Sequence, residues 1–159
     1  MTTDVKTTEA VIRPATSDDR SAIERLLIDA GLPTDGIAEL LADHPNDFFV
    51  AEANDATRAI VGAGGLEACC DDALLRSVVV QPEWRSRGVG NELVRRIVCH
   101  AESRGMRALY LLTLTAEHYF PKFGFERIER GSVPREIAET VEFKSACPDT
   151  AAVMKKAIA

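Results

Sequence analysis

Residues 78–90 have the sequence VVVQPEWRSRGVG, and this stretch decides how the fold is organised. It predicts a buried strand, a sharp turn and a tight loop that opens directly onto a helix. The run from Val78 to Val80 is short and β-branched, and the following Pro82 favours a strand over a buried helix. After the loop, apolar residues recur with the spacing of one helix face, and Gly105 is placed to cap the end of that helix. The apolar residues are Val89, Leu93, Val94, Ile97, Val98 and Ala101.

The loop between this strand and this helix has the chemistry of an anion site. A helix that begins near Gly88 leaves its first amide N–H groups without partners inside the helix, and the helix dipole makes that end positive. Glycines at positions 88 and 90 allow a bulky anion to approach the backbone, and Arg85 and Arg87 add positive charge. The pattern therefore predicts a pyrophosphate cradle.

Two common phosphate loops do not fit the pattern. A P-loop needs a lysine after its second glycine, and none follows Gly90; a dinucleotide fingerprint needs a third glycine where Leu93 stands. The pattern Arg85-x-x-Gly88-x-Gly90 instead resembles the acetyl-coenzyme A loop of the GNAT acetyltransferases, Gln/Arg-x-x-Gly-x-Gly/Ala. The alternative is an ordinary strand-to-helix turn with incidental arginines.

The composition of the chain limits the number of domains and the classes of partner that we expect. With 159 residues, of which 46% are apolar and 28% charged, we expect one globular domain over residues 10–159 behind a flexible N-terminal tail of residues 1–9. The net charge of −6 argues against a nucleic-acid partner. The sequence shows neither a signal peptide nor an apolar run long enough to span a membrane, so we expect a cytoplasmic protein without a membrane partner.

The cysteines predict no metal site. Cys69, Cys70, Cys99 and Cys147 form neither a Cys-x-x-Cys pair nor a zinc spacing, so reduced thiols are expected. Cys147, before Pro148, is expected to be a buried structural thiol rather than an arsenic ligand.

Around the central stretch, short patterned segments predict the other elements. Helices are expected after Thr16 or Ser17, which can cap the first one, and around Ile37–Leu41. His44, beside a proline, is expected to be a surface turn residue. Strands are expected at residues 10–13, 47–53, 58–67, 73–80, 108–114 and 152–158, and glycines in the third of these predict a bulge or a close backbone approach. The strands on either side of the central helix should be parallel.

A second motif supports the resemblance. Residues 115–125, TAEHYFPKFGF, are similar to the closing motif of the family, a short helix followed by Lys-x-Gly-Phe. The two motifs together cover roughly residues 10–128. The resemblance implies an α+β, three-layer GNAT fold, in which a mixed twisted sheet has helices on both faces and parallel strands splay apart at the acetyl-coenzyme A site.

The resemblance also implies the site for the cosubstrate acetyl-coenzyme A. The backbone of Val78 and Val80 is expected to pair with the pantetheine arm, and an N–H group there can stabilise the oxyanion. The remaining cofactor-binding residues implied in this way are Arg85, Ser86, Arg87, Gly88, Val89, Gly90 and Phe120.

The C-terminal residues indicate a narrower class of acceptor molecule. Residues 134–156 and the segment Leu74–Ser77 are similar to the arsenic-resistance N-acetyltransferase branch, whose members are associated with acetylating the α-amino group of toxic phosphinic or arsinic amino-acid analogues. Arg76 is expected to share a strand face with Val78 and Val80 and to hold the acceptor carboxylate; the alternative is a salt bridge at a strand end. Thr113 is the second expected acceptor-binding residue.

The expected reaction is direct transfer to a neutral amine. Glu67 is the first candidate for the general base, and a solvated strand-end glutamate is its alternative. The family's usual general acid is a tyrosine five residues before the last phenylalanine of the closing motif. Phe120 stands at that position here, and Tyr119 precedes it, turned by about 100° if the segment is helical. Either Tyr119 takes the role, or water protonates the leaving thiolate.

Two other functions stay open at this point. Phe120 in place of tyrosine is compatible with a degenerate domain that binds acyl-coenzyme A as a sensor without turnover, and a peptide N-acetyltransferase is a nearby alternative. The expected partner is a small-molecule amine or amino acid, and the resemblance also allows a homodimer.

Overall fold

The computed structural model describes residues 10–146 and 149–158 of the chain. The predicted tail of residues 1–9 and the pair Cys147–Pro148 lie outside the described residues. Within the described part, seven strands form one mixed sheet in the order β1-β2-β3-β4-β5-β7-β6. The chain divides into two compact units, one with residues 10–65 and 77–97 and the other with residues 66–76 and 98–158.

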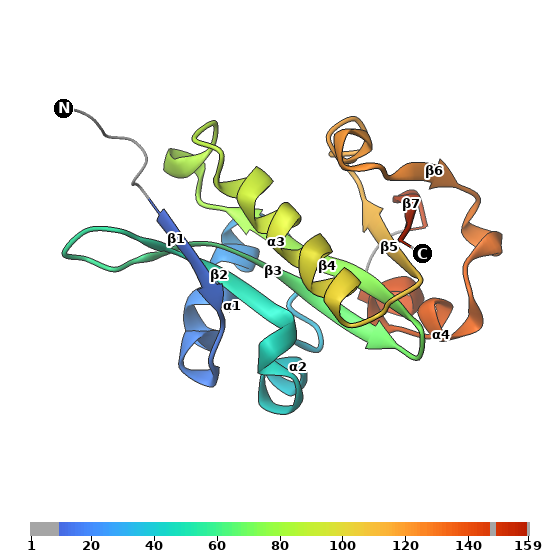
Figure 1. The fold of residues 1–159 in the computed structure, drawn as a ribbon, viewed down its shortest axis with the longest axis horizontal. Coiled ribbons are helices and arrows are strands. Elements are labelled where there is room, and N and C mark those ends of the chain that lie inside the picture. The colour runs from blue at the N-terminus through green and yellow to red at the C-terminus, as the bar shows by residue number, and fades with distance from the viewer. Residues whose placement is uncertain (1–9, 147–148, 159) are drawn as a thin grey trace. The chain divides into compact units, whose positions relative to one another are not determined.

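The first unit begins with an antiparallel pair of strands, β1 (Ala10–Pro14) and β2 (Phe48–Ala53), drawn in blue and cyan in Figure 1. Helices α1 (Arg20–Asp29) and α2 (Ile37–Asp43) connect them. β2 then pairs with β3 (Ile60–Cys69), also antiparallel, and a register shift after Ala51 forms the predicted bulge. As expected, His44 is an exposed residue at the end of α2.

Alternate residues of β3 face two different sets of helices within this unit. Ala63 belongs to a buried cluster with Ile23 and Leu27 of α1 and Ile37 of α2. On the opposite face, a Cβ atom on Gly64 would lie 3.0 Å from Ile97 Cδ1 of α3 (Val89–Ser103). A side chain at this position would push the helix away, so the glycine permits the close approach that the sequence indicated.

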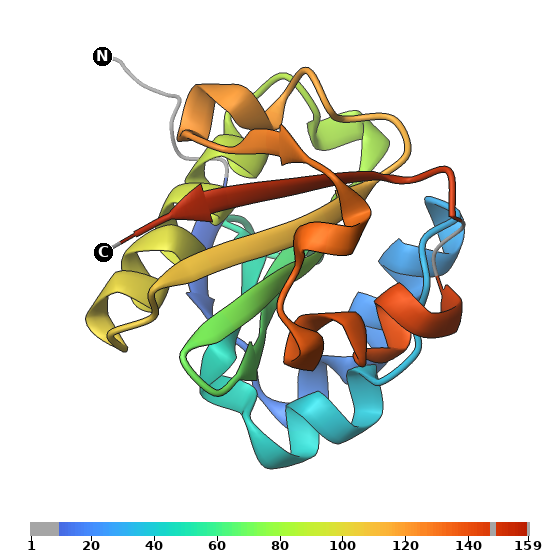
Figure 2. The ribbon, with the colours of Figure 1, turned by 90° about the vertical axis from the view of Figure 1, so that its right-hand side faces the viewer.

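The second unit is built on strand β5 (Ala108–Thr113), which lies between two partners. On one edge it pairs in parallel with β4 (Asp72–Val80), and the recorded pairs run from Asp72–Ala108 to Leu74–Tyr110. On its other edge β5 pairs along its whole length with the antiparallel strand β7 (Ala152–Ala157), as the gold and dark red arrows of Figure 2 show. β6 (Glu126–Ile128) completes this side of the sheet against β7.

The connection between β6 and β7 covers one face of these strands. It contains α4 (Arg135–Ala138), which begins directly after Pro134, and a π-helical turn at Glu142–Ala146. Ile137 and Phe143 from this connection pack with Leu74, Tyr110 and Val153 in a buried cluster.

The predicted elements are confirmed to within two residues at most ends, and the two strands flanking the central helix are parallel as expected. The closing motif is a 3-10 turn, Phe120–Phe123, and Gly124 ends it in the left-handed conformation with φ 96°. Among the described residues, no helix combines the length and the apolar character needed to cross a membrane.

Candidate active site

The loop predicted to bind a diphosphate lies wholly in the first unit. A short 3-10 turn at Pro82–Trp84 follows β4, and the chain then passes through Ser86 and Gly88, which adopt left-handed conformations with φ of 67° and 85°. The Gly88 carbonyl accepts a hydrogen bond from the Glu92 N–H group at 3.0 Å, so Gly88 is the residue that precedes α3. The first N–H groups of α3 therefore point out of the helix end beside an exposed loop.

Space is open at the mouth of this helix. A Cβ atom placed on Gly88 would meet no protein atom within 4 Å, and residues 85–88 are all exposed. Val89 differs from its neighbours, because its side chain is buried in the core and only its backbone is available to a ligand.

The two arginines of the loop are oriented by contacts with their own segment. Arg85 Nε donates to the Val80 carbonyl at 3.2 Å, and the Arg87 guanidinium lies 4.7 Å above the ring of Trp84. The carbonyl of Val80, which was expected to pair with a pantetheine arm, therefore already accepts one hydrogen bond and has one lone pair left.

β4 does not keep a regular alternation of side chains. Ser77 has φ 63°, a left-handed conformation that non-glycine residues adopt rarely. The prediction that Arg76 shares a face with Val78 and Val80 assumed a regular strand, and this residue interrupts it.

Arg76 and Glu67 meet in the second unit. The Arg76 side chain is fully buried, and its Nη1 atom donates to Glu67 Oε1 at 3.0 Å. Its Nη2 atom lies 3.3 Å from Oε2 of Glu142, a carboxylate that is itself only 7% exposed. The structure thus contains the salt bridge considered as the alternative for Arg76, and it adds Glu142, to which the sequence reasoning gave no role.

Cys69 lies beside this ion-pair group. Burial raises the pKa of its thiol to about 11, and the nearby charge of Glu67 acts in the same direction. The thiol donates a weak hydrogen bond to the Glu67 carbonyl at 3.6 Å. A thiol in this state is a poor nucleophile and a poor arsenic or metal ligand at neutral pH, because both roles need the thiolate.

The aromatic residues of the closing motif differ in their burial and in the side chains they contact. Phe120 is 7% exposed and packs edge-on against Phe125, with ring centroids 5.7 Å apart. Tyr119 is half-buried between the rings of Phe120 and Phe123, and Lys122 Nζ lies 4.3 Å from its ring centroid. The Oγ1 atom of Thr113 accepts the Ala116 N–H at 2.9 Å and so closes the turn after β5.

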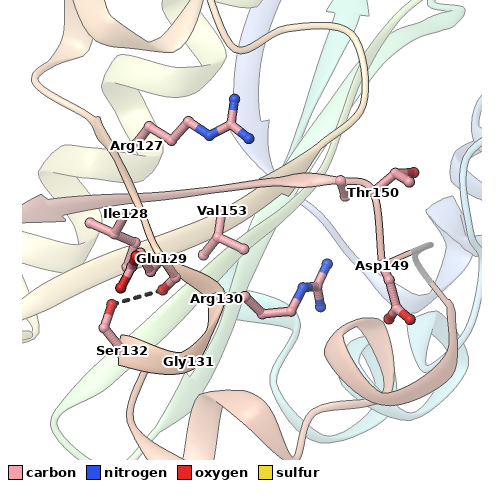
Figure 3. Close-up of a pocket in the computed structure, with 10 residues that line it drawn as sticks. Arg127, Ile128, Glu129, Arg130, Gly131, Ser132, Asp149, Thr150 and Val153 are labelled. Carbon is pink, nitrogen blue, oxygen red and sulfur yellow. Dashed lines mark hydrogen bonds between the residues drawn. The ribbon is translucent and has the colours of Figure 1, made fainter.

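A cavity of about 1080 Å³ opens in the second unit, between the segment that follows β6 and the segment that leads into β7 (Figure 3). Sequence reasoning did not find it, because its two sides are about twenty residues apart in the chain. It is lined by Arg127, Ile128, Glu129, Arg130, Gly131, Ser132, Asp149, Thr150, Ala151 and Val153. Among the described residues, no group of three or more His, Cys, Asp and Glu side chains is placed to hold a metal ion.

Comparisons with known proteins agree with this fold. A protein-family model described as "Acetyltransferase (GNAT) domain" matches residues 44–127, more than half of the chain. An uncharacterized N-acetyltransferase of Chlorobaculum tepidum is 29% identical over 141 residues, covering 81% of this chain and 83% of the relative. An amino-acid acetyltransferase of Pseudomonas putida is 30% identical over 120 residues, covering 72% of this chain but 27% of the relative.

Two solved structures share the architecture. Rv2747 from Mycobacterium tuberculosis, in complex with CoA and NLQ, has a TM-score of 0.78 at 23% identity, covering 94% of this chain and 99% of the other. N-acetylglutamate synthase from Neisseria gonorrhoeae, complexed with coenzyme A and N-acetyl-glutamate, has a TM-score of 0.79 at 19% identity. The match covers 98% of this chain and 36% of that synthase.

Proposed function

Because the chain belongs to the GNAT acetyltransferase family, we propose that it transfers the acetyl group of acetyl-coenzyme A to the amino group of a small amino acid or amino-acid analogue. The observation that carries the proposal is the loop from Arg85 to Gly90, exposed over residues 85–88, which opens onto the N-terminus of α3 with two residues in left-handed conformations. Such a helix end attracts diphosphate because its amides and its dipole both favour negative charge.

The backbone and the arginines of the loop have distinct parts in this proposal. The N–H groups at the start of α3 donate to the diphosphate, and the open space at Gly88 admits it next to the backbone. Arg85 and Arg87 supply positive charge, and their contacts with Val80 and Trp84 reduce the entropy lost when they bind an anion.

Acetyl transfer then needs an activated amine and a stabilised oxyanion. In the proposed mechanism Glu67 accepts a proton as the amine nitrogen attacks the thioester carbon, and the backbone near Val78 and Val80 stabilises the oxyanion. The intermediate then collapses: the new C–N bond is kept, the C–S bond breaks, and Tyr119 or water protonates the departing thiolate. The ion pair with Arg76 gives the Glu67 carboxylate a fixed orientation.

The acceptor is proposed to be an α-amino acid. Relatives that carry the name amino-acid acetyltransferase, together with the synthase that binds N-acetyl-glutamate, support this class. Arsinic and phosphinic analogues keep the same α-amino and α-carboxyl groups, so the arsenic-resistance prediction is a special case of it. Arg76 and Thr113 remain the proposed acceptor-binding residues; a direct contact by Arg76 would require it to exchange one of its carboxylate partners for the ligand.

The test is release of coenzyme A from acetyl-coenzyme A with a panel of amino acids, their phosphinic analogues and simple amines. The proposal predicts turnover with at least one amino acid, and a Glu67→Gln variant with a lower kcat and an altered pH profile. Binding of acetyl-coenzyme A without turnover on any acceptor would favour the sensor, the second candidate, which the buried phenylalanine at position 120 also supports.

A further inference from the structure

The fully buried Arg76 guanidinium faces two carboxylates that differ in exposure. Its Nη1 atom lies 3.0 Å from Oε1 of Glu67, whose side chain is 22% exposed. Its Nη2 atom lies 3.3 Å from Oε2 of Glu142, whose side chain is 7% exposed. All three residues belong to the second unit. Glu142 is therefore the more deeply buried partner of this cation, and Glu67 is the partner that water or a ligand can reach.

The turn that carries Glu142 is held in place by its neighbours. Glu142 opens the π-helical turn after α4, and the next residue, Phe143, packs in the buried cluster of the second unit. The buried Thr140 hydroxyl donates to the Ile137 carbonyl at 2.8 Å, and the Thr140 carbonyl accepts the Lys144 N–H group at 3.0 Å. These contacts fix the backbone on both sides of Glu142, so its carboxylate is presented from a defined position.

A buried cation needs a counterion at every stage of the proposed reaction, because an uncompensated buried charge is costly. When Glu67 takes the proton of the attacking amine, its carboxylate becomes neutral and no longer compensates Arg76. The Glu142 carboxylate still does, so Arg76 and Glu142 together remain neutral while Glu67 carries the proton. Without the charge of Glu142, the same protonation would leave Arg76 without either of the two carboxylates that flank it, and Glu67 would be a weaker base.

The other titratable groups around Glu67 leave this balance to Arg76 and Glu142. Cys69, on the same strand as Glu67, is neutral at pH 7 because burial raises the pKa of its thiol to about 11. The further groups whose charges act on that thiol are all acids, from the end of β3, from β4 and from α4: Cys70, Asp72 and Glu136. In the part of the chain that the structure describes, the cation at ion-pair distance from Glu67 is Arg76. A residue that compensates Arg76 therefore controls how readily Glu67 accepts a proton.

We infer that Glu142 is a positioning residue of the acetyl transfer, which holds and compensates Arg76 so that Glu67 can accept the proton of the attacking amine. The inference rests on the proposed function, since it takes Glu67 as the general base. The proton moves from the amine nitrogen to a Glu67 oxygen as the C–N bond forms, and it passes to water from the exposed part of that side chain before the next turnover. Glu142 stays ionised throughout and acts through Arg76.

The direct test follows the ionisation of Glu67 without any reaction. In protein labelled with carbon-13 at the glutamate carboxyl groups, the resonance of Glu67 is assigned by its loss in Glu67→Gln and is then titrated against pH. Glu142→Gln removes the compensating charge, so the midpoint of this titration should move towards acid by about one pH unit or more. An unchanged midpoint overturns the inference.

The second measurement is the pH dependence of coenzyme A release with an acceptor that reacts. In Glu142→Gln the acidic limb of kcat/KM should move in step with the Glu67 midpoint. The plateau of kcat should fall about 3- to 10-fold for each pH unit of that shift, because a carboxylate that is harder to protonate is a weaker base. A midpoint that moves while the acidic limb stays at its wild-type position overturns the inference, and so does a variant that only lowers the melting temperature.

Glu139→Gln is the matched control. It is the same substitution three positions earlier in the same connection, but Glu139 is 58% exposed and pairs with Arg135 at 3.3 Å. It should leave both the midpoint and the acidic limb unchanged. Glu142→Asp keeps the charge but withdraws it from Arg76 by one methylene group. It should give a smaller shift in the same direction, and it carries the test if Glu142→Gln does not fold.

The two measurements separate this inference from the proposed function. A shifted midpoint in a protein that transfers no acetyl group to any acceptor supports the charge coupling between Glu142 and Glu67 and overturns acetyl transfer. Acetyl transfer with the same midpoint and the same acidic limb in wild type and Glu142→Gln overturns the role of Glu142, while acetyl transfer itself stands.

Discussion

Among single residues, Arg76 is one whose removal should strongly destabilise the fold. Its buried guanidinium lies between the carboxylates of Glu67 and Glu142, so its removal leaves two negative charges facing each other with little water. Breaking a buried ion pair from one side costs far more than the pair contributes when it is intact, because the remaining charge is uncompensated.

We therefore expect Arg76→Ala to lower the free energy of unfolding by about 3 to 5 kcal/mol in urea denaturation, towards the lower value because Glu67 is 22% exposed. Arg107→Ala is the control, since Arg107 is 66% exposed and its carboxylate partners lie 3.8 and 3.9 Å away. It should change stability by no more than about 0.5 kcal/mol. If both variants are equally stable and Arg76→Ala only raises KM for an amino acid, Arg76 contacts the acceptor directly.

Cys69 gives a prediction about pH. Because its pKa is raised to about 11, the reactive thiolate is a small fraction at neutral pH and grows about tenfold per pH unit up to that value. Iodoacetamide labelling followed by peptide mass spectrometry should show Cys69 reacting far more slowly than the exposed Cys70 and Cys99 between pH 7 and 9.5. Equal labelling rates for Cys69 and Cys99 would mean that Cys69 is not held in the buried environment described above.

At the scale of elements, the contact between β2 and β3 depends on a glycine. A Cβ atom on Gly65 would lie 2.5 Å from Cγ of Phe48, a ring that is fully buried and has no room to move. We expect Gly65→Ala to lower the free energy of unfolding by about 1 to 3 kcal/mol, through overpacking.

Gly131→Ala provides the comparison, because a Cβ atom there meets nothing within 4 Å. Chemical denaturation of the two variants side by side separates the effect of space from the effect of the added methyl group. A Gly65→Ala protein as stable as the Gly131→Ala protein would show that β2 and β3 pack less closely than described.

The loop and α3 form the element that binds the cofactor in the proposed function. Gly88→Ala adds a methyl group in the space assigned to the diphosphate and strains a residue with φ 85°, at a cost of about 1 kcal/mol in stability. Gly105→Ala is a close match, since Gly105 has φ 74°, equally open surroundings and a place at the other end of the helix.

Both variants should lose similar stability. Only Gly88→Ala should weaken the binding of acetyl-coenzyme A, by about tenfold or more, because the added methyl group should remove about one charge-assisted hydrogen bond to the diphosphate. Calorimetric Kd values for the two variants provide the measurement. Equal Kd values would remove Gly88 from the binding site.

At the scale of the whole molecule, the predictable parts of the fold are the local ones. The strand, loop and helix between Val78 and Ser103 follow from β-branched residues, a proline, two glycines and an apolar stripe that lie next to one another in the sequence. The left-handed Ser77 was not predictable, because nothing in its residue type requires φ 63°.

Contacts between residues far apart in the chain limit how much of the candidate site could be predicted from the sequence. Glu142 lies 66 positions after Arg76, and only the fold shows that the two are 3.3 Å apart, although residue 142 belongs to a motif noted in the sequence. The cavity with Arg130 and Asp149 depends in the same way on the pairing of β6 with β7. Phe120 was singled out in the sequence, and the fold supplies the reason for its residue type: its burial explains why a phenylalanine fits where the family resemblance implied a tyrosine.

The family assignment and the site converge on one physical requirement, which is that the amides at the start of α3 bind the diphosphate of acetyl-coenzyme A. Isothermal titration of the wild-type protein tests it most directly, with acetyl-coenzyme A in one experiment and acetyl-pantetheine, which lacks the diphosphate, in the other. We predict saturable binding of acetyl-coenzyme A with one site per chain, and binding of acetyl-pantetheine weaker by at least about 100-fold. Equal affinities for the two ligands, or no binding of acetyl-coenzyme A at all, would contradict the account.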